Sequence, residues 1–319
     1  MKAVEIPRPG PPEVMRVVEK PDPQPKPGEL LIDVRAAGVN FADIMGRMGL
    51  YPDAPPFPFV CGYEVAGTLA DGRRVLAFTR FGGYASKAVS PERAVVPLPD
   101  TMSFEEGAAI PVVYSTAWVA LVAMARVAAG DRVLVEQAAG GVGIAAIQIA
   151  KQAGAEVWGV VSTDAKAEFL RGLGVTALVR GRDPWPRDLD LILDPTGASA
   201  LPRDLEHLTP SGRVVLFGAS EMVGGRTRSL LRAGWRYFRR PRIDPYDLMN
   251  RNRGIYGLNM LTLSQRRDLI DRGMREIMKG AAEGWINPRV DRTFPLERAA
   301  EAHAYIQDRR NIGKVVLTV

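Results

Sequence analysis

The chain has 319 residues, of which 46% are hydrophobic and 24% charged, and its formal net charge is +6. This length favours two domains over one, and the balanced composition excludes a largely disordered chain. No run approaches the ~18 consecutive apolar residues of a membrane-spanning helix, and the first residues lack the apolar core of a secretory signal. The single cysteine, Cys61, excludes an internal disulfide and fits a reducing compartment, so we expect a cytoplasmic protein.

Residues 1 to about 115 carry many prolines and glycines between short β-branched runs at 30–34, 64–69 and 74–77. This pattern predicts a compact β-rich domain. A helix is expected to begin near Ser115, and the chain closes with a turn and strand at 313–317 that return to the first domain. The second domain would then be inserted between two parts of the first.

Residues 133–143 (VLVEQAAGGVG) read as a buried strand that runs into a glycine turn and then a helix over 144–153. Such a turn offers unpaired backbone N–H groups and the positive end of a helix to a pyrophosphate. A glycine triplet alone is weak evidence, because any tight strand-to-helix turn needs glycine. We therefore treat dinucleotide binding as a hypothesis that the neighbouring strands must support.

Further strands are predicted at 156–161, 188–193 and 213–217, with helical or turn-rich stretches between them. Strands that alternate with helices predict an α/β fold with a doubly wound parallel sheet. Each of these strands ends in a small or polar turn, at 162–164, 194–197 and 218–220. Because ligands bind at the carboxyl ends of strands in such sheets, these turns give the nucleotide site a rim.

The end of the second strand of this sheet favours NADPH over NADH. NAD enzymes place an acidic residue there for the ribose diol, but this strand ends in Ser162 and Thr163, and the first carboxylate, Asp164, comes late. Ser162, Thr163 and Lys166 are suited to a 2′-phosphate by hydrogen bonding and charge. The alternatives are a helix cap for Ser162 and Thr163 and a solvated lysine for Lys166.

The segment 226–242 contains seven arginines interleaved with leucines and aromatic residues. Helical spacing would place Leu231, Trp235 and Phe238 on one face, next to a basic one. A basic amphipathic helix of this kind is suited to an anionic membrane surface, although such stripes more often pack on the host domain or on a second subunit. The charge excess is mild over the whole chain and no nucleic-acid-binding signature accompanies it, so no nucleic-acid partner is expected.

Five stretches carry a family resemblance. They are residues 38–43 (GVNFAD), 49–52 (GLYP), 62–67 (GYEVAG), 138–143 (AAGGVG) and 313–316 (GKVV). In these stretches the chain resembles the medium-chain dehydrogenase/reductase superfamily and, within it, the zinc-free quinone oxidoreductases of the zeta-crystallin type. Residues 137–141 (QAAGG) and the segment from 239–245 (RRPRIDP) through 257–259 (GLN) are similar to the vesicle amine transport protein homologues.

The resemblance implies a Rossmann domain inserted in a GroES-like domain. We place the GroES-like catalytic and substrate domain at 1–118 and 260–319, and the Rossmann dinucleotide-binding domain at 119–259. Relatives often dimerise through the Rossmann domain, so a homodimer is expected.

The resemblance also implies the loss of catalytic zinc. Zinc enzymes of the superfamily use a cysteine and a neighbouring histidine-glutamate pair, where this chain has Asn40 and Tyr63-Glu64. A Lewis-acid site needs about three converging ligands, and the two histidines lie far from this region in the sequence, so no metal is expected. Cys61 is expected to be a packed residue.

By the same resemblance, Asn40 and Tyr51 line the acceptor pocket as positioning groups, with Tyr63 as a further candidate that alternatively fills vacated volume. Asp43 is expected to cap or orient the following helix. The residues expected to contact the cofactor are Thr116, Ala139, Gly140, Gly141, Val142, Ser162, Thr163, Lys166, Arg182, Phe217, Gly218, Ala219, Leu258, Asn259 and Lys314.

Two departures from the family pattern bear on the cofactor. Gly181 stands where a tyrosine often helps to hold the 2′-phosphate, and either neighbouring arginine, Arg180 or Arg182, could replace it. Gln137 replaces the small residue that is common at the first glycine position of the turn.

A quinone or enone accepts hydride at an already electrophilic position, so orientation and a few hydrogen bonds suffice without zinc. The sequence thus predicts a zinc-independent NADPH-dependent reductase of a quinone or another conjugated carbonyl. An enoyl-thioester reductase is a rival with the same chemistry. A rival from another class is a low-turnover nucleotide-binding protein that associates with membranes or handles lipid.

Overall fold

The computed structural model describes residues 1–223, 225, 234–235, 238–263 and 265–319. The chain divides into two compact units. Unit 1 comprises Met1–Val113, Pro288–Val319 and the described residues from 223 to 229, and unit 2 comprises Tyr114–Met222 and the described residues from 230 to 287. The chain therefore changes unit after 113 and 287 and also on either side of 223–229, whereas the expected boundaries were at 118 and 259. Helix α10 (Arg267–Ala282) belongs to unit 2.

Unit 1 is β-rich, as its short β-branched runs predict. Its larger sheet has the strand order β15-β16-β3-β5-β6-β8, with β7 also paired to β3, and a smaller sheet has the order β2-β1-β4. The strands are β1 (Lys2–Ile6), β2 (Arg16–Glu19), β3 (Glu29–Val39), β4 (Phe59–Val60), β5 (Glu64–Thr68), β6 (Arg74–Phe78), β7 (Lys87–Pro91), β8 (Val95–Pro97), β15 (Val290–Pro295) and β16 (Lys314–Thr318). Because β16 pairs antiparallel with β3, the predicted return of the chain end to the first domain is confirmed.

Helices of unit 1 pack against its larger sheet. The helices of this unit are α1 (Phe41–Arg47), α2 (Phe104–Ala108) and α11 (Ala299–Gln307), with single 3-10 turns η1 (Pro12–Val14), η2 (Glu92–Ala94) and η6 (Leu296–Arg298). The core of the unit combines Ile32 of β3, Val65 of β5 and Leu317 of β16 with Tyr84 and Ala302. Burial of these apolar side chains fixes the register of the strands, because a one-residue slip would turn them to the other face.

Unit 2 is built on a six-stranded sheet of order β11-β10-β9-β12-β13-β14. Its strands are β9 (Arg132–Val135), β10 (Glu156–Val161), β11 (Thr176–Val179), β12 (Leu189–Asp194), β13 (Leu208–Leu216) and β14 (Gly254–Gly257). Every neighbouring pair is parallel, which confirms the predicted doubly wound sheet. Its central strands β9, β10, β12 and β13 contribute the fully buried side chains Leu134, Val160, Ile192 and Val214 to the core.

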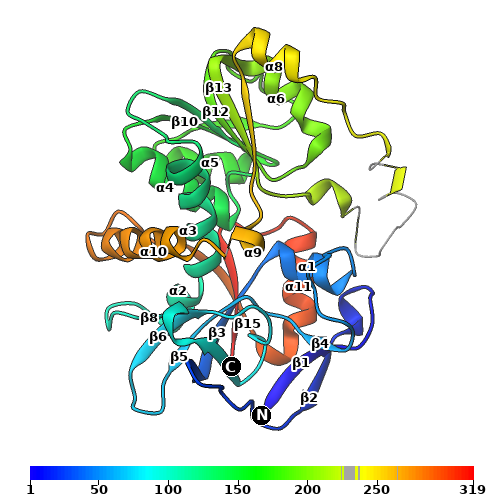
Figure 1. The fold of residues 1–319 in the computed structure, drawn as a ribbon, viewed down its shortest axis with the longest axis vertical. Helices are drawn as coiled ribbons and strands as arrows, with labels where there is room; N and C mark the ends of the chain where they lie inside the picture. Colours follow the sequence, from blue (N-terminus) through cyan, green and yellow to red (C-terminus); the bar gives the residue numbers. More distant parts are fainter. Residues whose placement is uncertain (224, 226–233, 236–237, 264) are drawn as a thin grey trace. The chain divides into compact units, whose positions relative to one another are not determined.

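Helices alternate with these strands. In Figure 1 the green helices α4 and α5 pack beside β10, and α6 lies by β13. The helical segments of unit 2 are α3 (Pro111–Trp118, which begins in unit 1), the π-helical η3 (Val119–Met124), α4 (Gly141–Gln152), α5 (Asp164–Gly172), η4 (Ala198–Ala200), α6 (Leu201–His207), η5 (Ser220–Met222), α8 (Pro245–Arg251), α9 (Met260–Leu263) and α10. Trp118 donates from Nε1 to Glu276 Oε2 at 2.8 Å, which anchors α10 within unit 2.

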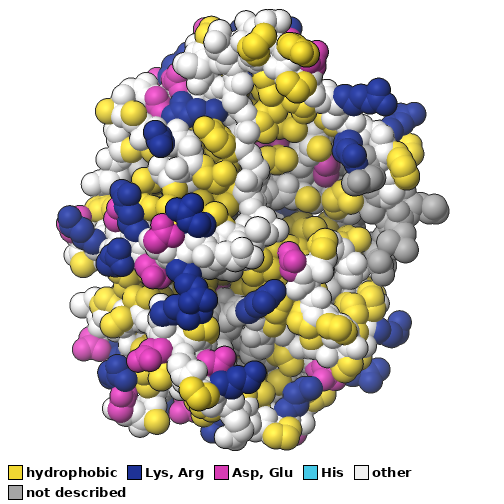
Figure 2. All heavy atoms as spheres, in the orientation of Figure 1, with side chains coloured by type: hydrophobic (Ala, Val, Ile, Leu, Met, Phe, Trp, Pro, Cys, Tyr) yellow, Lys and Arg dark blue, Asp and Glu magenta, His cyan; other side chains and the backbone are white. Residues whose placement is uncertain are grey.

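The predicted basic helix over 226–242 lies partly outside the described residues, because 226–233 and 236–237 are not among them. In the described part, Trp235 and Phe238 are 58% and 86% exposed, and the Arg239 guanidinium lies 4.7 Å from the centre of the Trp235 ring. On the face drawn in Figure 2, Lys and Arg side chains are scattered among hydrophobic and acidic ones. Among the described helices, none has the length and apolar character that crossing a membrane requires.

Candidate functional site

The glycine turn of unit 2 joins the tip of β9 directly to α4. Gly140 is the N-cap of α4 and no side chain caps it, so the backbone amides of the first turn are left for a ligand. A Cβ on Gly143 would lie 2.5 Å from the carbonyl oxygen of Ala138, so only glycine lets the helix pack this closely on the turn. The turn therefore has the form that a pyrophosphate requires.

The tip of β10 carries the residues predicted to contact a 2′-phosphate. Thr163 caps α5, since its Oγ1 accepts from the Lys166 backbone amide at 3.4 Å, and this confirms the cap that was an alternative for it. Ser162 is exposed beside it. Arg182 donates to Asp164 at 2.8 Å and to Asp183 at 3.2 Å, and all three side chains remain solvent-accessible. A 2′-phosphate at this tip would compete with these two carboxylates for Arg182.

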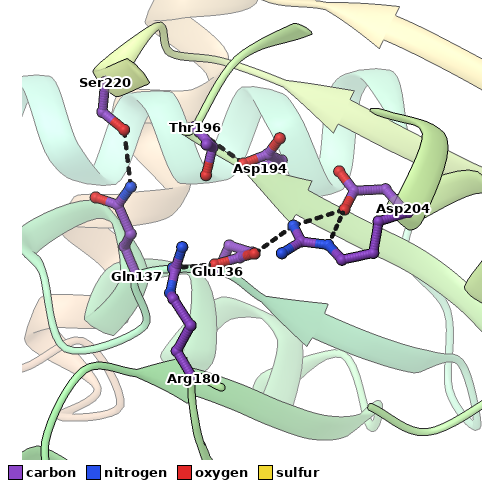
Figure 3. Close-up of polar contacts among 8 residues, drawn as sticks. Glu136, Gln137, Arg180, Asp194, Thr196, Asp204 and Ser220 are labelled. Atoms are coloured by element: carbon purple, nitrogen blue, oxygen red, sulfur yellow. Dashed lines mark hydrogen bonds and ion pairs between the residues drawn. The ribbon is translucent and has the colours of Figure 1, made fainter. Parts of the chain in front are cut away.

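The loop after β13 forms the other side of the strand-end site. Phe217, Gly218 and Ala219 are partly exposed there, and a Cβ on Gly218 would lie 2.5 Å from the Pro195 carbonyl oxygen. The side chains of Gln137 and Ser220 point toward each other across the strand ends (Figure 3), with Gln137 Nε2 donating to Ser220 Oγ at 2.9 Å. The glycine turn and the β13 loop are thus linked by a side chain.

The remaining predicted cofactor residues of unit 2 lie at other positions of the same unit. Leu258 is buried and its amide donates to Leu216 O at 2.9 Å, which continues β14 past β13. Asn259 is exposed, and its Oδ1 accepts from the Leu261 amide at 3.0 Å. Thr116 is buried in α3. The cofactor contacts of all these residues stay predictions.

A buried charge cluster at the same strand ends was not anticipated from the sequence. Glu136, at the tip of β9, is fully buried and accepts from Arg180 and from Arg203 of α6 (Figure 3). Burial raises the pKa of Glu136, while the two guanidinium groups oppose that rise. Arg180 was one of two arginines considered for the 2′-phosphate, but in the structure its guanidinium binds Glu136.

Two further buried carboxylates complete this cluster. Arg203 also donates to Asp204 Oδ1 at 2.9 Å, and Asp194 Oδ1 accepts from the Thr196 amide at 2.6 Å. The second oxygens of Asp194 and Asp204 have no hydrogen-bond partner among the described residues. Burial, and next the negative charge of Asp194, raise the pKa of Asp204 to about 7. The cluster therefore changes charge near neutral pH.

In unit 1, Asn40, which the family resemblance places in the acceptor pocket, is hydrogen-bonded to a buried ion pair. Lys314 Nζ lies 2.5 Å from Glu64 Oε1 and donates to Asn40 Oδ1 at 2.6 Å, while Asn40 Nδ2 donates to the same Glu64 oxygen at 2.8 Å. The other Glu64 oxygen accepts from the Val112 amide at 2.7 Å. Lys314, predicted as a cofactor contact, thus binds the predicted acceptor residue within its own unit.

The two predicted tyrosines lie together in unit 1. The Tyr51 and Tyr63 rings are 6.3 Å apart in an edge-to-face arrangement, and Tyr63 also packs on Phe81 with ring centres 5.0 Å apart. Tyr51 is half-buried, and the Tyr63 hydroxyl is buried with no partner among the described residues. Burial raises the pKa of both phenols, so each stays a hydrogen-bond donor. A buried hydroxyl without a partner is uncommon and suggests a ligand that completes it.

Asp43 begins a buried hydrogen-bond chain. It accepts from the Asn40 amide at 2.8 Å, from the Gly62 amide at 3.0 Å and from the Tyr84 hydroxyl at 3.1 Å, so its predicted role of orienting α1 is confirmed. Burial raises the pKa of Asp43 to about 7, against these hydrogen bonds. Tyr84 also lies 3.1 Å from His303 Nε2, and His303 Nδ1 lies 3.1 Å from Arg47 Nη1. Nothing local in the sequence pointed to His303, which joins the chain from the far end of the sequence.

The donor set of unit 1 does not fit a catalytic zinc ion. Within the described residues, no group of three or more His, Cys, Asp or Glu side chains is arranged to hold a metal. Cys61 is buried and donates weakly to the Asp43 carbonyl oxygen at 3.7 Å, as expected for a packed residue. Glu64 is already neutralised by Lys314.

Two protein-family patterns match the chain. Residues 26–100 match the alcohol dehydrogenase GroES-like domain, and residues 168–317 match a family described as zinc-binding dehydrogenase. The first match confirms the predicted GroES-like domain.

Individual proteins match over nearly the whole chain. The synaptic vesicle membrane protein VAT-1 homolog of Danio rerio is 34% identical over 94% of this chain, which spans 66% of that relative's length. The quinone oxidoreductase of Thermus thermophilus, solved alone and with NADPH, is 32% identical, with a TM-score of 0.87 and 100% of both chains covered. The CurK enoyl reductase is 25% identical, with a TM-score of 0.84 over 99% of this chain and 98% of its own.

The fold, the order of the motifs and the sequence identity over nearly the whole chain all indicate the same superfamily. The chain belongs to the medium-chain dehydrogenase/reductase superfamily, with quinone oxidoreductases and VAT-1 homologues among its relatives.

Proposed function

We propose that this chain is an NADPH-dependent oxidoreductase that reduces a quinone or another conjugated carbonyl without zinc. The observation that carries the proposal is the Lys314-Glu64-Asn40 cluster, because by resemblance Asn40 and Glu64 stand where zinc enzymes of the superfamily carry metal ligands. An amide and a neutralised carboxylate are poor zinc ligands, whereas they can orient an acceptor that is already electrophilic. Similarity to a quinone oxidoreductase solved with NADPH supports the same assignment.

We assign the cofactor to the strand ends of unit 2. NADPH supplies the hydride when bound. The uncapped N-terminus of α4, with Ala139, Gly140, Gly141 and Val142, is suited to its pyrophosphate. Ser162, Thr163, Lys166 and Arg182 would hold the 2′-phosphate, and Phe217, Gly218 and Ala219 would pass beneath the nicotinamide ribose. By resemblance, Thr116, Leu258 and Asn259 are assigned to the nicotinamide side, and Lys314 resembles the family lysine near the cofactor cleft.

We assign the acceptor to unit 1. Hydride addition to a quinone leaves negative charge on an oxygen, which a hydrogen-bond donor stabilises. The Tyr63 hydroxyl is the strongest candidate, because it is protonated and has no partner among the described residues. Tyr51 packs against the ring, and Asn40, fixed by Lys314, orients it. The hydroquinone is completed by a proton from solvent.

The test is absorbance at 340 nm of EDTA-treated protein with NADPH or NADH against quinones, enones and enoyl thioesters. We expect NADPH oxidation with quinones or enones at a rate that EDTA does not change. Loss of the rate with EDTA and its return with zinc would overturn zinc independence. NADPH binding without turnover on any acceptor would move the assignment to a nucleotide-binding protein.

Tyr63→Phe tests the acceptor assignment. We expect kcat/KM for the quinone to fall about tenfold, since one hydrogen bond to developing charge contributes roughly 1–2 kcal/mol. The melting temperature should stay equal or rise slightly, because the hydroxyl that is removed has no partner among the described residues. Tyr305→Phe, which removes a hydroxyl bound to Asp291, serves as the control. Unchanged quinone kinetics in Tyr63→Phe would remove Tyr63 from the site.

Asp164→Asn tests the 2′-phosphate assignment. The exposed Arg182–Asp164 pair competes with a phosphate, so its removal should tighten NADPH binding about two- to threefold and leave NADH binding unchanged. Titration of the cofactor fluorescence measures both dissociation constants. An equal change in the dissociation constants of NADPH and NADH would show that Arg182 does not bind the 2′-phosphate.

An enoyl-thioester reductase is the second candidate, supported by the similarity to the CurK enoyl reductase. Both reactions add hydride to a conjugated carbonyl system, so the fold does not separate them. Faster NADPH oxidation with an enoyl thioester than with any quinone would favour this candidate.

We also propose that the protein is a cytoplasmic homodimer that contacts anionic membranes through 226–242. The described end of that segment supports membrane contact by exposing Trp235 and Phe238 beside Arg239. Light scattering after size exclusion would measure the dimer, and a monomer mass would refute it. Equal sedimentation with neutral and anionic vesicles would refute an anionic membrane contact.

A further inference from the structure

Gln137 takes a backbone conformation that ordinarily belongs to glycine. Its φ is +52°, in the left-handed region, at the first position of the glycine turn. A side chain with a Cβ is strained there, while glycine is not. Strain of this kind persists where the surroundings hold the residue in place, and it often marks a functional position. The glutamine side chain makes a contact at this position that glycine could not make.

The side chain reaches across the sheet edge. In the sheet order, β12 separates β9 from β13, so the loops after β9 and β13 are not neighbours. Gln137 Nε2 nevertheless donates to Ser220 Oγ at 2.9 Å (Figure 3). The Ser220 amide donates to Pro195 O at 3.1 Å in the intervening loop. The Gln137–Ser220 bridge therefore adds a direct link between two loops that backbone hydrogen bonds connect only through β12 and the loop after it.

These are the two loops that the proposed function assigns to the pyrophosphate and to the nicotinamide ribose of the cofactor. The turn that contains Gln137 leads into the uncapped N-terminus of α4, and Ser220 directly follows Phe217, Gly218 and Ala219. A ligand that contacts both loops binds best when their separation already matches its length, because less ordering accompanies binding.

We propose that Gln137 is a positioning residue that, through Ser220, holds the glycine turn and the β13 loop at the spacing that an intact dinucleotide requires. This inference rests on the proposed function and deepens it. It concerns affinity for the whole cofactor and involves no chemical step. The strained backbone at Gln137 is then the consequence of aiming the amide at Ser220.

The test compares Gln137→Ala, Gln137→Gly, Ser220→Ala and the double variant Gln137→Ala/Ser220→Ala. The dissociation constant of NADPH is measured by fluorescence titration, and the melting temperature of each protein is measured without cofactor. We expect each single variant to weaken NADPH binding about three- to tenfold, the range of one hydrogen bond. The double variant should be no weaker than the singles, because both remove the same bridge. Gln152→Ala, at the exposed far end of α4, is the control.

Gln137→Gly separates positioning from a purely structural role. It removes the backbone strain, so its melting temperature should equal or exceed that of the wild type while its NADPH binding is still weakened. A ligand that carries only the adenine half, adenosine 2′,5′-bisphosphate, should bind all variants and the wild type equally. A glycine variant that binds NADPH as tightly as the wild type would overturn the inference, and so would equal weakening of the half-ligand. If the wild type binds neither NADPH nor NADH, the proposed function falls as well.

Discussion

Replacing Lys314 by methionine is expected to destabilise unit 1 by about 3–5 kcal/mol, because it leaves the Glu64 carboxylate buried without a counter-charge. Lys314 is 4% exposed and Glu64 is fully buried, so water cannot replace the lost ammonium group. The Asn40 and Val112 donors that remain to Glu64 are neutral. Methionine has nearly the length of lysine, so the effect reports the charge more than a cavity.

Hydrogen exchange measures this change locally. All five tryptophans belong to unit 2, so tryptophan fluorescence does not follow unit 1. We expect amides of β5 and β16 to exchange at least about 100-fold faster in Lys314→Met, and protection to return substantially in Lys314→Met/Glu64→Gln, where no charge is left unpaired. Lys2→Met removes an exposed ion pair with Glu297 and should change exchange little. Wild-type protection in Lys314→Met would show that Glu64 does not need the ammonium group.

The parts of the fold that the sequence predicts are those set by local pattern. Apolar runs of strand length bounded by turns identified β10 as Glu156–Val161 to the residue. The glycine turn located α4, because only glycine allows the contact between Gly143 and Ala138. The sequence pattern alone did not predict the bounds of the short edge strands β11 and β14, because four residues carry little periodic signal.

The polar networks of both units could not be predicted from local sequence patterns, because their partners lie far apart in the sequence. Glu136 meets Arg203 across 67 positions, and Asn40 meets Lys314 across 274. Each residue alone is compatible with solvent exposure, and only the fold brings the partners together. Helix α10 belongs to unit 2, where Glu276 accepts from Trp118 across 158 positions of the sequence.

Resemblance named site residues that pattern alone could not, but it did not reveal how they are held. It indicated Asn40 and Lys314 separately, and the structure joins them through Glu64. It marked Gln137 as a departure from the family, and the structure shows the bond to Ser220 that the departure makes possible. The departures from a family pattern are therefore the positions where the structure adds most.

Buried carboxylates lie next to the predicted sites in both units. In unit 2, the raised pKa of Asp204 is expected to make stability depend strongly on pH. Asp204 has a folded-state pKa of about 7, raised first by burial and then by Asp194, against the pull of Arg203. Its pKa in an unfolded chain is about 3.9. Between these values the folded protein holds a proton that the unfolded chain has lost, so the free energy of unfolding falls by about 1.4 kcal/mol per pH unit as pH rises, and no further above pH 7.

Asp204→Asn is therefore expected to gain about 2–3 kcal/mol in stability relative to the wild type between pH 5 and pH 8. Asparagine is neutral at every pH, as the protonated carboxyl is, and it keeps an oxygen for Arg203. Urea unfolding followed by tryptophan fluorescence measures unit 2, which holds all five tryptophans. Glu206→Gln removes an exposed carboxylate from the same helix and controls for the change in net charge. A stability difference between Asp204→Asn and the wild type that stays constant from pH 5 to pH 8 would mean that Asp204 is already ionised in the folded protein at pH 5. The two guanidinium groups would then outweigh burial in this cluster.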